Sequence, residues 1–164
     1  MHIKDIHTIC KQSGISFVPT LIRHWYWRLV RHANILLSPH VHWFGKGRIN
    51  LNGRLMAGFD NSILSHPNTP TTIKMFGNLI VTGIARIQRG CRIEVGESAT
   101  LELDNCFINS NCLILCQHSV SIGADTAIGW NTQICDEDYH EIMCANRQNL
   151  AQIAKLRGGG GKNR

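Results

Sequence analysis

A six-residue return of aliphatic side chains dominates the second half of the chain. Ile122, Ile128 and Ile134 stand six positions apart, and Gly123 and Gly129 follow the first two of them. This period fits neither a 3.6-residue helix nor a strand with alternating faces. It fits a solenoid with three short flat faces, in which each coil turns its corners near inward-pointing aliphatic residues, because hexapeptide repeats are typical of parallel β-helices.

Looser copies of the repeat precede this stretch. Ile87 and Ile93 are six apart, and a second ladder with the same spacing begins at Val95, but the register slips between ladders. Bulged corners account for such slips. We therefore predict an all-β fold, a parallel β-helix from about Ile49 to Ile134. Its predicted inward side chains are Val95, Leu101, Phe107, Leu113, Ile122, Ile128 and Ile134.

Composition favours one globular domain in a reducing compartment. The chain has 164 residues, of which 43% are hydrophobic and 17% charged, and its formal net charge is +6. No basic stripe interleaved with aromatic residues runs through it, so we expect no nucleic-acid partner. The seven cysteines form no CxxC pair, and the first ten residues lack the pattern of an export signal. We expect buried free thiols and a soluble, cytoplasmic protein.

An amphipathic helix is predicted near the N-terminus. Pro19 argues for a break, Thr20 can serve as an N-cap, and a helix fits the stretch from Leu21 to Leu37. Its predicted inward face holds Ile22, Tyr26, Leu29, Val30, Ala33 and Leu37, with Arg23, Arg31 and Asn34 facing solvent. Two roles are open for this basic, Trp-rich helix: peripheral contact with a membrane surface, or a cap across one end of the solenoid.

The motifs between Asn78 and Ile142 resemble the left-handed β-helix acyltransferases of the hexapeptide-repeat superfamily. The resemblance is specific to the maltose, galactoside and polysaccharide O-acetyltransferases. It rests on Asn109-Ser110-Asn111, an aliphatic strand, a short edge, the Ile-Gly repeats, the acidic loop Asp136-Glu137-Asp138-Tyr139, and His140. It implies a left-handed coil, and it divides the chain into an N-terminal segment (1–40), the β-helix acyltransferase domain (41–142) and a divergent, flexible tail (143–164).

The resemblance also implies a chemistry. Such an enzyme moves an acetyl or similar group from acetyl-coenzyme A to a hydroxyl of a sugar or polysaccharide precursor, in clefts between the subunits of a homotrimer. A base with a pKa near neutrality must take the hydroxyl proton, and His140 is the candidate. Glu137 or Asp138 would orient its ring. Asn111 matches the position that holds the acceptor hydroxyl, although an asparagine can equally close a β-helix corner.

Other site types have weaker support. Cys135, His140 and Cys144 have a spacing that could supply three zinc ligands, but a fourth is lacking, so no metal is expected. A cysteine nucleophile is disfavoured because direct acyl transfer needs none. After Met143 the family's further coils, which carry much of the coenzyme A groove, are missing. This departure leaves a second hypothesis open, a catalytically silent β-helix that acts as a scaffold or interaction protein.

Overall fold

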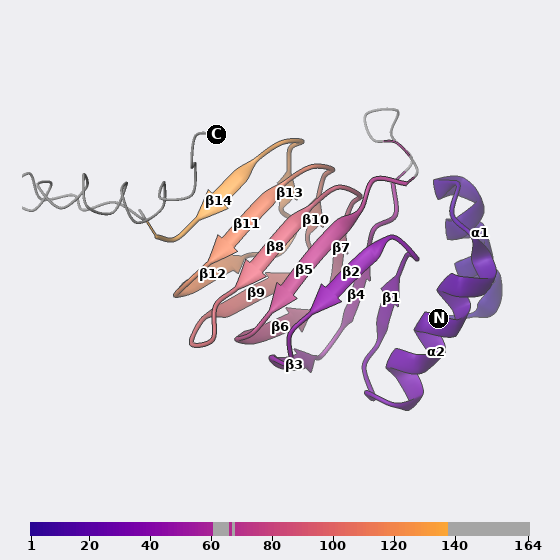
Figure 1. The fold of residues 1–164 in the computed structure, drawn as a ribbon, viewed down its shortest axis with the longest axis horizontal. Coiled ribbons are helices and arrows are strands. Elements are labelled where there is room, and N and C mark those ends of the chain that lie inside the picture. Colours follow the sequence, from indigo (N-terminus) through magenta and orange to yellow (C-terminus); the bar gives the residue numbers. More distant parts are fainter. Residues whose placement is uncertain (61–65, 67, 138–164) are drawn as a thin grey trace, which may run out of the picture.

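The computed structural model describes residues 1–60, 66 and 68–137, and within them the chain forms a three-sided solenoid with two helices at one end (Figure 1). All strand pairs are parallel. Sheet A has the order β1-β4-β7-β10-β13, sheet B has β14-β11-β8-β5-β2, and sheet C has β12-β9-β6-β3. Each coil visits A, B and C in turn and winds with a left hand, so the predicted left-handed parallel β-helix is confirmed.

The strands are short, as flat faces between corners require. Sheet A contains β1 (Ile35–Leu37), β4 (Arg54–Ala57), β7 (Ile84–Ile87), β10 (Phe107–Ile108) and β13 (Ala127–Ile128). Sheet B contains β2 (Val41–Phe44), β5 (Thr71–Met75), β8 (Arg92–Val95), β11 (Leu113–Cys116) and β14 (Gln133–Cys135). Sheet C contains β3 (Arg48–Leu51), β6 (Asn78–Thr82), β9 (Thr100–Asp104) and β12 (Ser119–Ile122). The coil therefore begins at Ile35, earlier than the predicted Ile49.

The coils are longer than three perfect hexapeptides. Arg86 pairs with Phe107 and Phe107 with Ala127, which gives steps of 21 and 20 residues. Extra residues lie in the corner that joins sheet A to sheet B, because Ile108 and Cys116, which pair with Ile87 and Val95, are eight positions apart. This corner has a left-handed residue, Asn111, with φ 63°. Short polar side chains tolerate this conformation better than most residues. One coil is longer still, because Leu55 pairs with Ala85 and the insertion lies between β4 and β5.

The corner at Asn105 shifts the inward register by one residue. Val95, Leu101 and Ile122 are buried as predicted, and Ile128 and Ile134 pack partly buried against the core. Phe107 and Leu113 do not point inward: Ile108 and Ile114 are buried in their place, at 0% and 1% exposure. The prediction failed there because the corner at Asn105 is one residue shorter than its counterparts. Ile108 follows Leu103 by five positions, whereas the residues that pair with them in the adjoining coils are six positions apart.

The N-terminal helices differ from the predicted one. Helix α1 (Ile3–Ser13) was not predicted, although Asp5 accepts a hydrogen bond from the His2 N–H and Gly14 closes the helix with φ 64°. Helix α2 is Phe17–Leu29. Pro19 lies in its first turn, where proline is tolerated, and Thr20 is a buried interior residue whose hydroxyl donates to the Ser16 carbonyl.

The predicted helix ends too late as well. The Ala33 N–H donates to the Trp27 carbonyl at 2.9 Å across His32, which has φ 49°, so a left-handed residue ends the helical path of the chain. Residues 35–37 then form β1, buried on both faces: Ile35 and Leu37 face the core, and Leu36 packs against α1. The sequence did not indicate this helix end because a histidine, His32, holds the left-handed position where a glycine is usual.

The inward face of α2 is also the reverse of the prediction. Thr20, His24 and Trp27 are buried against the first coil. Ile22, Tyr26, Leu29 and Val30 are 52% to 65% exposed. The more polar face of α2 packs against the solenoid because two of its side chains bind backbone carbonyl groups at the end of the prism.

Those two side chains are Arg23 and His24. Arg23 donates to the carbonyl oxygens of Ser38, Pro39 and Val41 at 2.9 to 3.1 Å. His24 Nδ1 lies 2.9 Å from the Ile35 carbonyl oxygen. The predicted solvent position of Arg23 is therefore wrong, and the predicted cap across the first coil is present with another face inward. In the described part of the chain, neither helix is long and apolar enough to cross a bilayer.

Candidate functional site

Asn111 lies in the left-handed turn that joins β10 to β11, with φ 63°. Its N–H donates to the Arg89 carbonyl at 3.1 Å. Its side chain lies over Gly90 of the preceding coil, where an added Cβ would collide with Asn111 Oδ1. Gly90 and Asn131 hold the same place in the adjoining coils, with φ 78° and 59°. Asn111 thus closes a corner in a column of left-handed residues.

A buried polar cluster lies behind this corner. Arg89 is 2% exposed and donates through Nη2 to the Ser13 carbonyl at 2.7 Å and to the Asp60 carbonyl at 3.3 Å. The Ser110 hydroxyl donates to the Asp60 carboxylate and is 3.1 Å from Gln88 Oε1. Burial lowers the pKa of Arg89, and the nearby Asp60 opposes this shift. The cluster ties α1 and the insertion after β4 to the coil.

Asp136 is a site residue whose role the sequence did not reveal. Its carboxylate accepts hydrogen bonds from the N–H groups of Gln117, His118 and Ser119 at 2.7 to 2.8 Å. Burial alone would raise the pKa of this carboxyl, but the N–H donors outweigh it and the pKa is lowered. Asp136 therefore clamps the end of β14 to the corner of the coil before it, four positions ahead of His140.

His140 and Asp138 lie outside the described residues, so the proposed base and one of its two candidate orienting groups remain predictions. Glu137 is exposed directly after the clamp. Asn111 precedes β11 and Asp136 follows β14, its neighbour in sheet B. At about 3.3 Å per strand residue the two positions are separated by on the order of 15 Å. Within one chain, Asn111 and Asp136 therefore lie at opposite ends of two neighbouring strands, β11 and β14.

The outer surface of sheet B between these two positions is hollowed. We call it the sheet B face. The hollow has a volume of about 350 Å³ and an aliphatic floor that includes Leu113 and Leu115. Charged side chains of neighbouring strands surround this floor, and Lys74 pairs with Glu94 at 3.0 Å. Its lining residues are Thr72, Lys74, Arg92, Ile93, Glu94, Leu113 and Leu115.

The described cysteines do not form a reactive centre. Five are buried, as predicted, and Cys135 is exposed. Burial raises the pKa of Cys91 to about 12 and that of Cys106 to about 11, and it also raises the pKa of Cys116. These thiols are protonated at neutral pH and act as small core residues. Among residues 1–60, 66 and 68–137, His, Cys, Asp and Glu nowhere gather in a group of three that could hold a metal ion.

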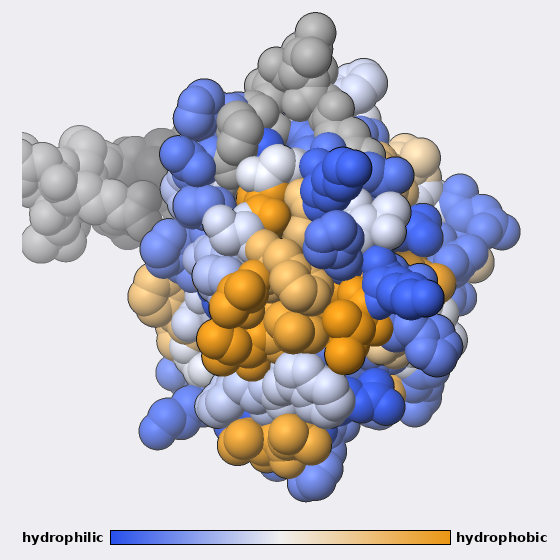
Figure 2. All heavy atoms as spheres, turned by 90° about the vertical axis from the view of Figure 1, so that its right-hand side faces the viewer, coloured by the Kyte–Doolittle hydropathy of each residue, from blue (hydrophilic) through white to orange (hydrophobic). Residues whose placement is uncertain are grey.

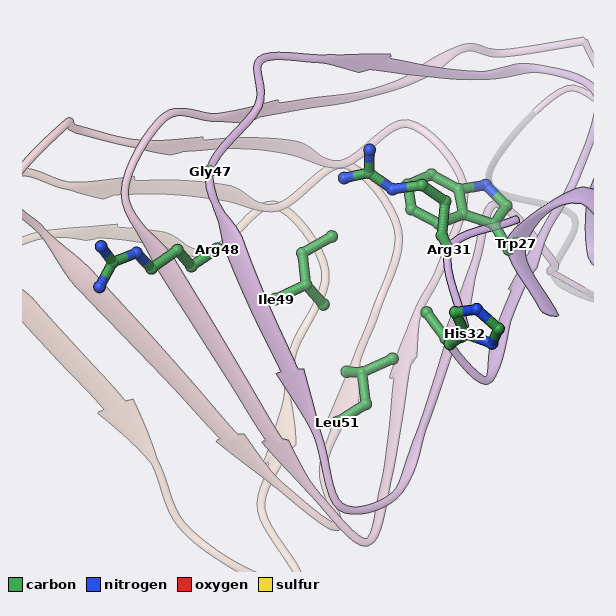
Figure 3. Close-up of a pocket in the computed structure, with 8 residues that line it drawn as sticks. Trp27, Arg31, His32, Gly47, Arg48, Ile49 and Leu51 are labelled. Carbon is green, nitrogen blue, oxygen red and sulfur yellow. The ribbon is translucent and has the colours of Figure 1, made fainter. Parts of the chain in front are cut away.

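A second hollow, which was not predicted, lies at the end of the prism that α2 covers. It has a volume of about 320 Å³ and lies between the end of α2 and β3. Ile49 and Leu51 point into it from β3, whereas Arg31 and Arg48 lie at its margins (Figure 3). The Arg31 guanidinium lies 5.8 Å from the Trp27 ring centroid. The hollow thus combines two aliphatic side chains of β3 with two arginines.

Comparison with known proteins gives one informative relative. The chain is 30% identical over 135 residues to the "Uncharacterized 24.8 kDa protein in cps region" of Klebsiella pneumoniae. The alignment covers 81% of this chain and 61% of the relative, so the chain spans about three fifths of that protein's length. No model of a known protein family matches the chain, and no solved structure does. The cps label places the relative in a capsule polysaccharide gene region.

Proposed function

We propose that this protein is an O-acyltransferase that moves an acetyl or similar group from acetyl-coenzyme A to a sugar hydroxyl in the synthesis of a surface polysaccharide. The proposal rests chiefly on the left-handed parallel β-helix whose last described coil ends at the Asp136 clamp, four positions before His140. The relative from a capsule polysaccharide region supports a polysaccharide-related role.

The proposed chemistry is direct transfer. The His140 imidazole accepts the proton of the sugar hydroxyl while the hydroxyl oxygen attacks the thioester carbonyl carbon. The carbon–sulfur bond then breaks, and coenzyme A leaves as a thiolate that takes up a proton. Asp136 would contribute by fixing the start of the loop that carries His140, because a fixed loop start limits the distance between the base and the sugar hydroxyl.

The sheet B face has side chains suited to part of the acyl donor. Leu113 and Leu115 offer an apolar surface to the alkyl arm of coenzyme A, and Arg92 offers a positive charge to its phosphates. In a homotrimer this face and the histidine loop of a neighbouring chain would meet, which would overcome the separation of Asn111 from Asp136. The trimer remains part of the proposal.

Two measurements on the full chain test the enzyme. Calorimetric titration with acetyl-coenzyme A should show binding, and addition of a sugar acceptor should release free coenzyme A. His140→Ala should lower that release by about 10²- to 10⁴-fold without abolishing donor binding, because a general base is lost. Turnover that survives His140→Ala would refute the mechanism.

The silent scaffold is the second candidate, and the packing of Asn111 over Gly90 favours it because that role is structural. Two substitutions separate the roles. Asn111→Gly keeps the left-handed turn but removes the amide, whereas Asn111→Ala also strains the turn. If the amide binds the acceptor, both variants lose activity. Absence of acetyl-coenzyme A binding at millimolar ligand would leave the scaffold as the better account.

A further inference from the structure

An unpartnered apolar stripe runs along the solvent side of α2. Val18, Ile22, Trp25, Tyr26 and Leu29 recur with helical spacing and are 43% to 65% exposed. We call these residues the α2 outer stripe. Figure 2 looks onto this end of the molecule: hydrophobic side chains gather across its middle, and strongly hydrophilic ones lie around them. The terminal cap of a solenoid normally presents a polar outer face, so this surface needs an explanation.

Positive charge is concentrated around the same end. Residues 1–59 contain eight Lys and Arg but one acidic residue, Asp5, whereas residues 60–164 contain nine basic and ten acidic residues. The net charge of the whole chain therefore resides in its first third. Arg28 and Arg31 are exposed on or directly after α2. The partner of the stripe should therefore combine an apolar layer with negative charge.

We propose that the α2 outer stripe docks the protein on an anionic lipid bilayer, with α2 lying in the plane of the membrane surface. A helix with an apolar face, interfacial aromatic residues and flanking arginines is the arrangement that binds this boundary. The inference stands on the cap alone and does not depend on the proposed enzyme activity.

The hollows beside α2 fit the headgroup layer. Ile22 and Tyr26 line a hollow of about 520 Å³, which shares Trp27 and Arg31 with the hollow beneath the end of α2. Arginine guanidinium groups bind phosphate oxygens, and tryptophan and tyrosine favour the membrane–water interface. Phosphate groups of lipids would thus meet Arg31 and Arg48 while the stripe enters the outer acyl region.

A second copy of the chain fits this surface less well. A two-fold interface places the same patch of both copies face to face, so two strongly basic ends would meet, each with Asp5 as the one acidic residue among its residues 1–59. An anionic bilayer instead neutralises this charge. The occupant we propose is therefore the lipid surface, and self-association through the stripe is an alternative that the experiment separates.

Co-sedimentation of the full chain with vesicles tests the proposal. Vesicles of phosphatidylglycerol and phosphatidylethanolamine should bind the protein, and vesicles of phosphatidylcholine alone should bind it much more weakly. Ile22→Glu with Leu29→Glu should abolish binding, and the uncharged pair Ile22→Ser with Leu29→Ser should reduce it. Arg28→Gln and Arg31→Gln should each lower the partition coefficient about fivefold at low salt.

Trp130→Glu is the matched control, because Trp130 is 50% exposed but lies in the last described coil, away from α2. It should bind vesicles like the unchanged protein. Equal binding to neutral and anionic vesicles, or equal loss in the control, would overturn the proposal. The absence of vesicle binding would also overturn it. If sedimentation then showed self-association that Ile22→Glu abolished, the stripe would instead be a contact between copies of the chain. Circular dichroism would verify that each variant keeps its fold.

Discussion

At the scale of single residues, Asp136 shows how a side chain in an apparently open acidic loop fixes a corner. Its carboxylate accepts three backbone N–H groups of the preceding coil. Asp136→Asn should lower the free energy of unfolding at pH 7 by about 1–2 kcal/mol, as the loss of a capping carboxylate does, because an amide cannot accept all three donors. Chemical denaturation measures this difference.

The pH dependence of the free energy of unfolding, measured for the unchanged protein and for Asp136→Asn, gives a second test of the clamp. The pKa of Asp136 is lowered in the folded chain from an ordinary value of 3.8, so its contribution is present above pH 3.8 and is lost as the pH falls through the folded-state pKa. The stabilities of the two proteins should converge in acid. A difference that did not shrink as the pH was lowered through the acid range would contradict the clamp.

His24 should make stability depend on pH in the range of histidine titration. Burial, opposed by its hydrogen bond to Ile35, lowers the pKa of His24 below 6.5, and positive charges including Arg28 act in the same direction as burial. The unfolded chain then binds a proton more readily, so stability should fall as the pH drops below about 6.5. His24→Asn keeps a donor near the Ile35 carbonyl but cannot titrate. Its stability should fall less steeply between pH 7 and pH 5.

At the scale of elements, β10 decides the register of the later coils. Ile108 is fully buried, while Phe107 lies on the outer side of the strand. Ile108→Ala should destabilise the protein by about 2–5 kcal/mol, because it opens a cavity in the core. Phe107→Ala should cost clearly less. Thermal unfolding of the two variants checks this order, and a larger loss for Phe107→Ala would restore the register predicted from the sequence.

Arg89 joins α1 to the solenoid. Its guanidinium bridges the Ser13 and Asp60 carbonyl oxygens inside the protein. Arg89→Met should cost about 3–5 kcal/mol, because it removes the positive charge from beside a buried carboxylate. Limited proteolysis should then cut near α1 sooner than in the unchanged chain. Arg28→Met, at an exposed position of α2, serves as the control and should leave both readouts nearly unchanged.

At the scale of the whole molecule, two surfaces at different places have different expected partners. The sheet B face is the expected contact of the homotrimer, and the α2 outer stripe is the proposed membrane surface. Leu113→Glu with Leu115→Glu should convert a trimer to monomers in sedimentation equilibrium and also weaken acetyl-coenzyme A binding, because the new charges would lie in the cleft where the neighbouring chain and the alkyl arm meet this face. Ile22→Glu should leave the mass unchanged. A monomeric unchanged chain would remove the trimer from the proposed function.

The sequence by itself determined the architecture. The six-residue return of Ile122, Ile128 and Ile134 is compatible with few backbones, and the inward positions of Val95 and Leu101 followed from the same count. It also pointed to Asn111 as a residue of the corner or of the site. These inferences succeeded because a solenoid repeats local contacts, and local contacts leave a periodic trace in the chain.

Only the tertiary structure decided how the ends and corners are arranged. The corner at Asn105 is one residue shorter than those of the adjoining coils, and this places Ile108 instead of Phe107 in the core. Backbone carbonyls of the first coil bind Arg23 and His24, and the apolar side of α2 faces solvent. The three N–H partners of Asp136 lie 17 to 19 positions before it in the chain. Such contacts depend on which distant segments lie side by side in the folded chain, and the hydrophobic pattern of the sequence does not predict these neighbours.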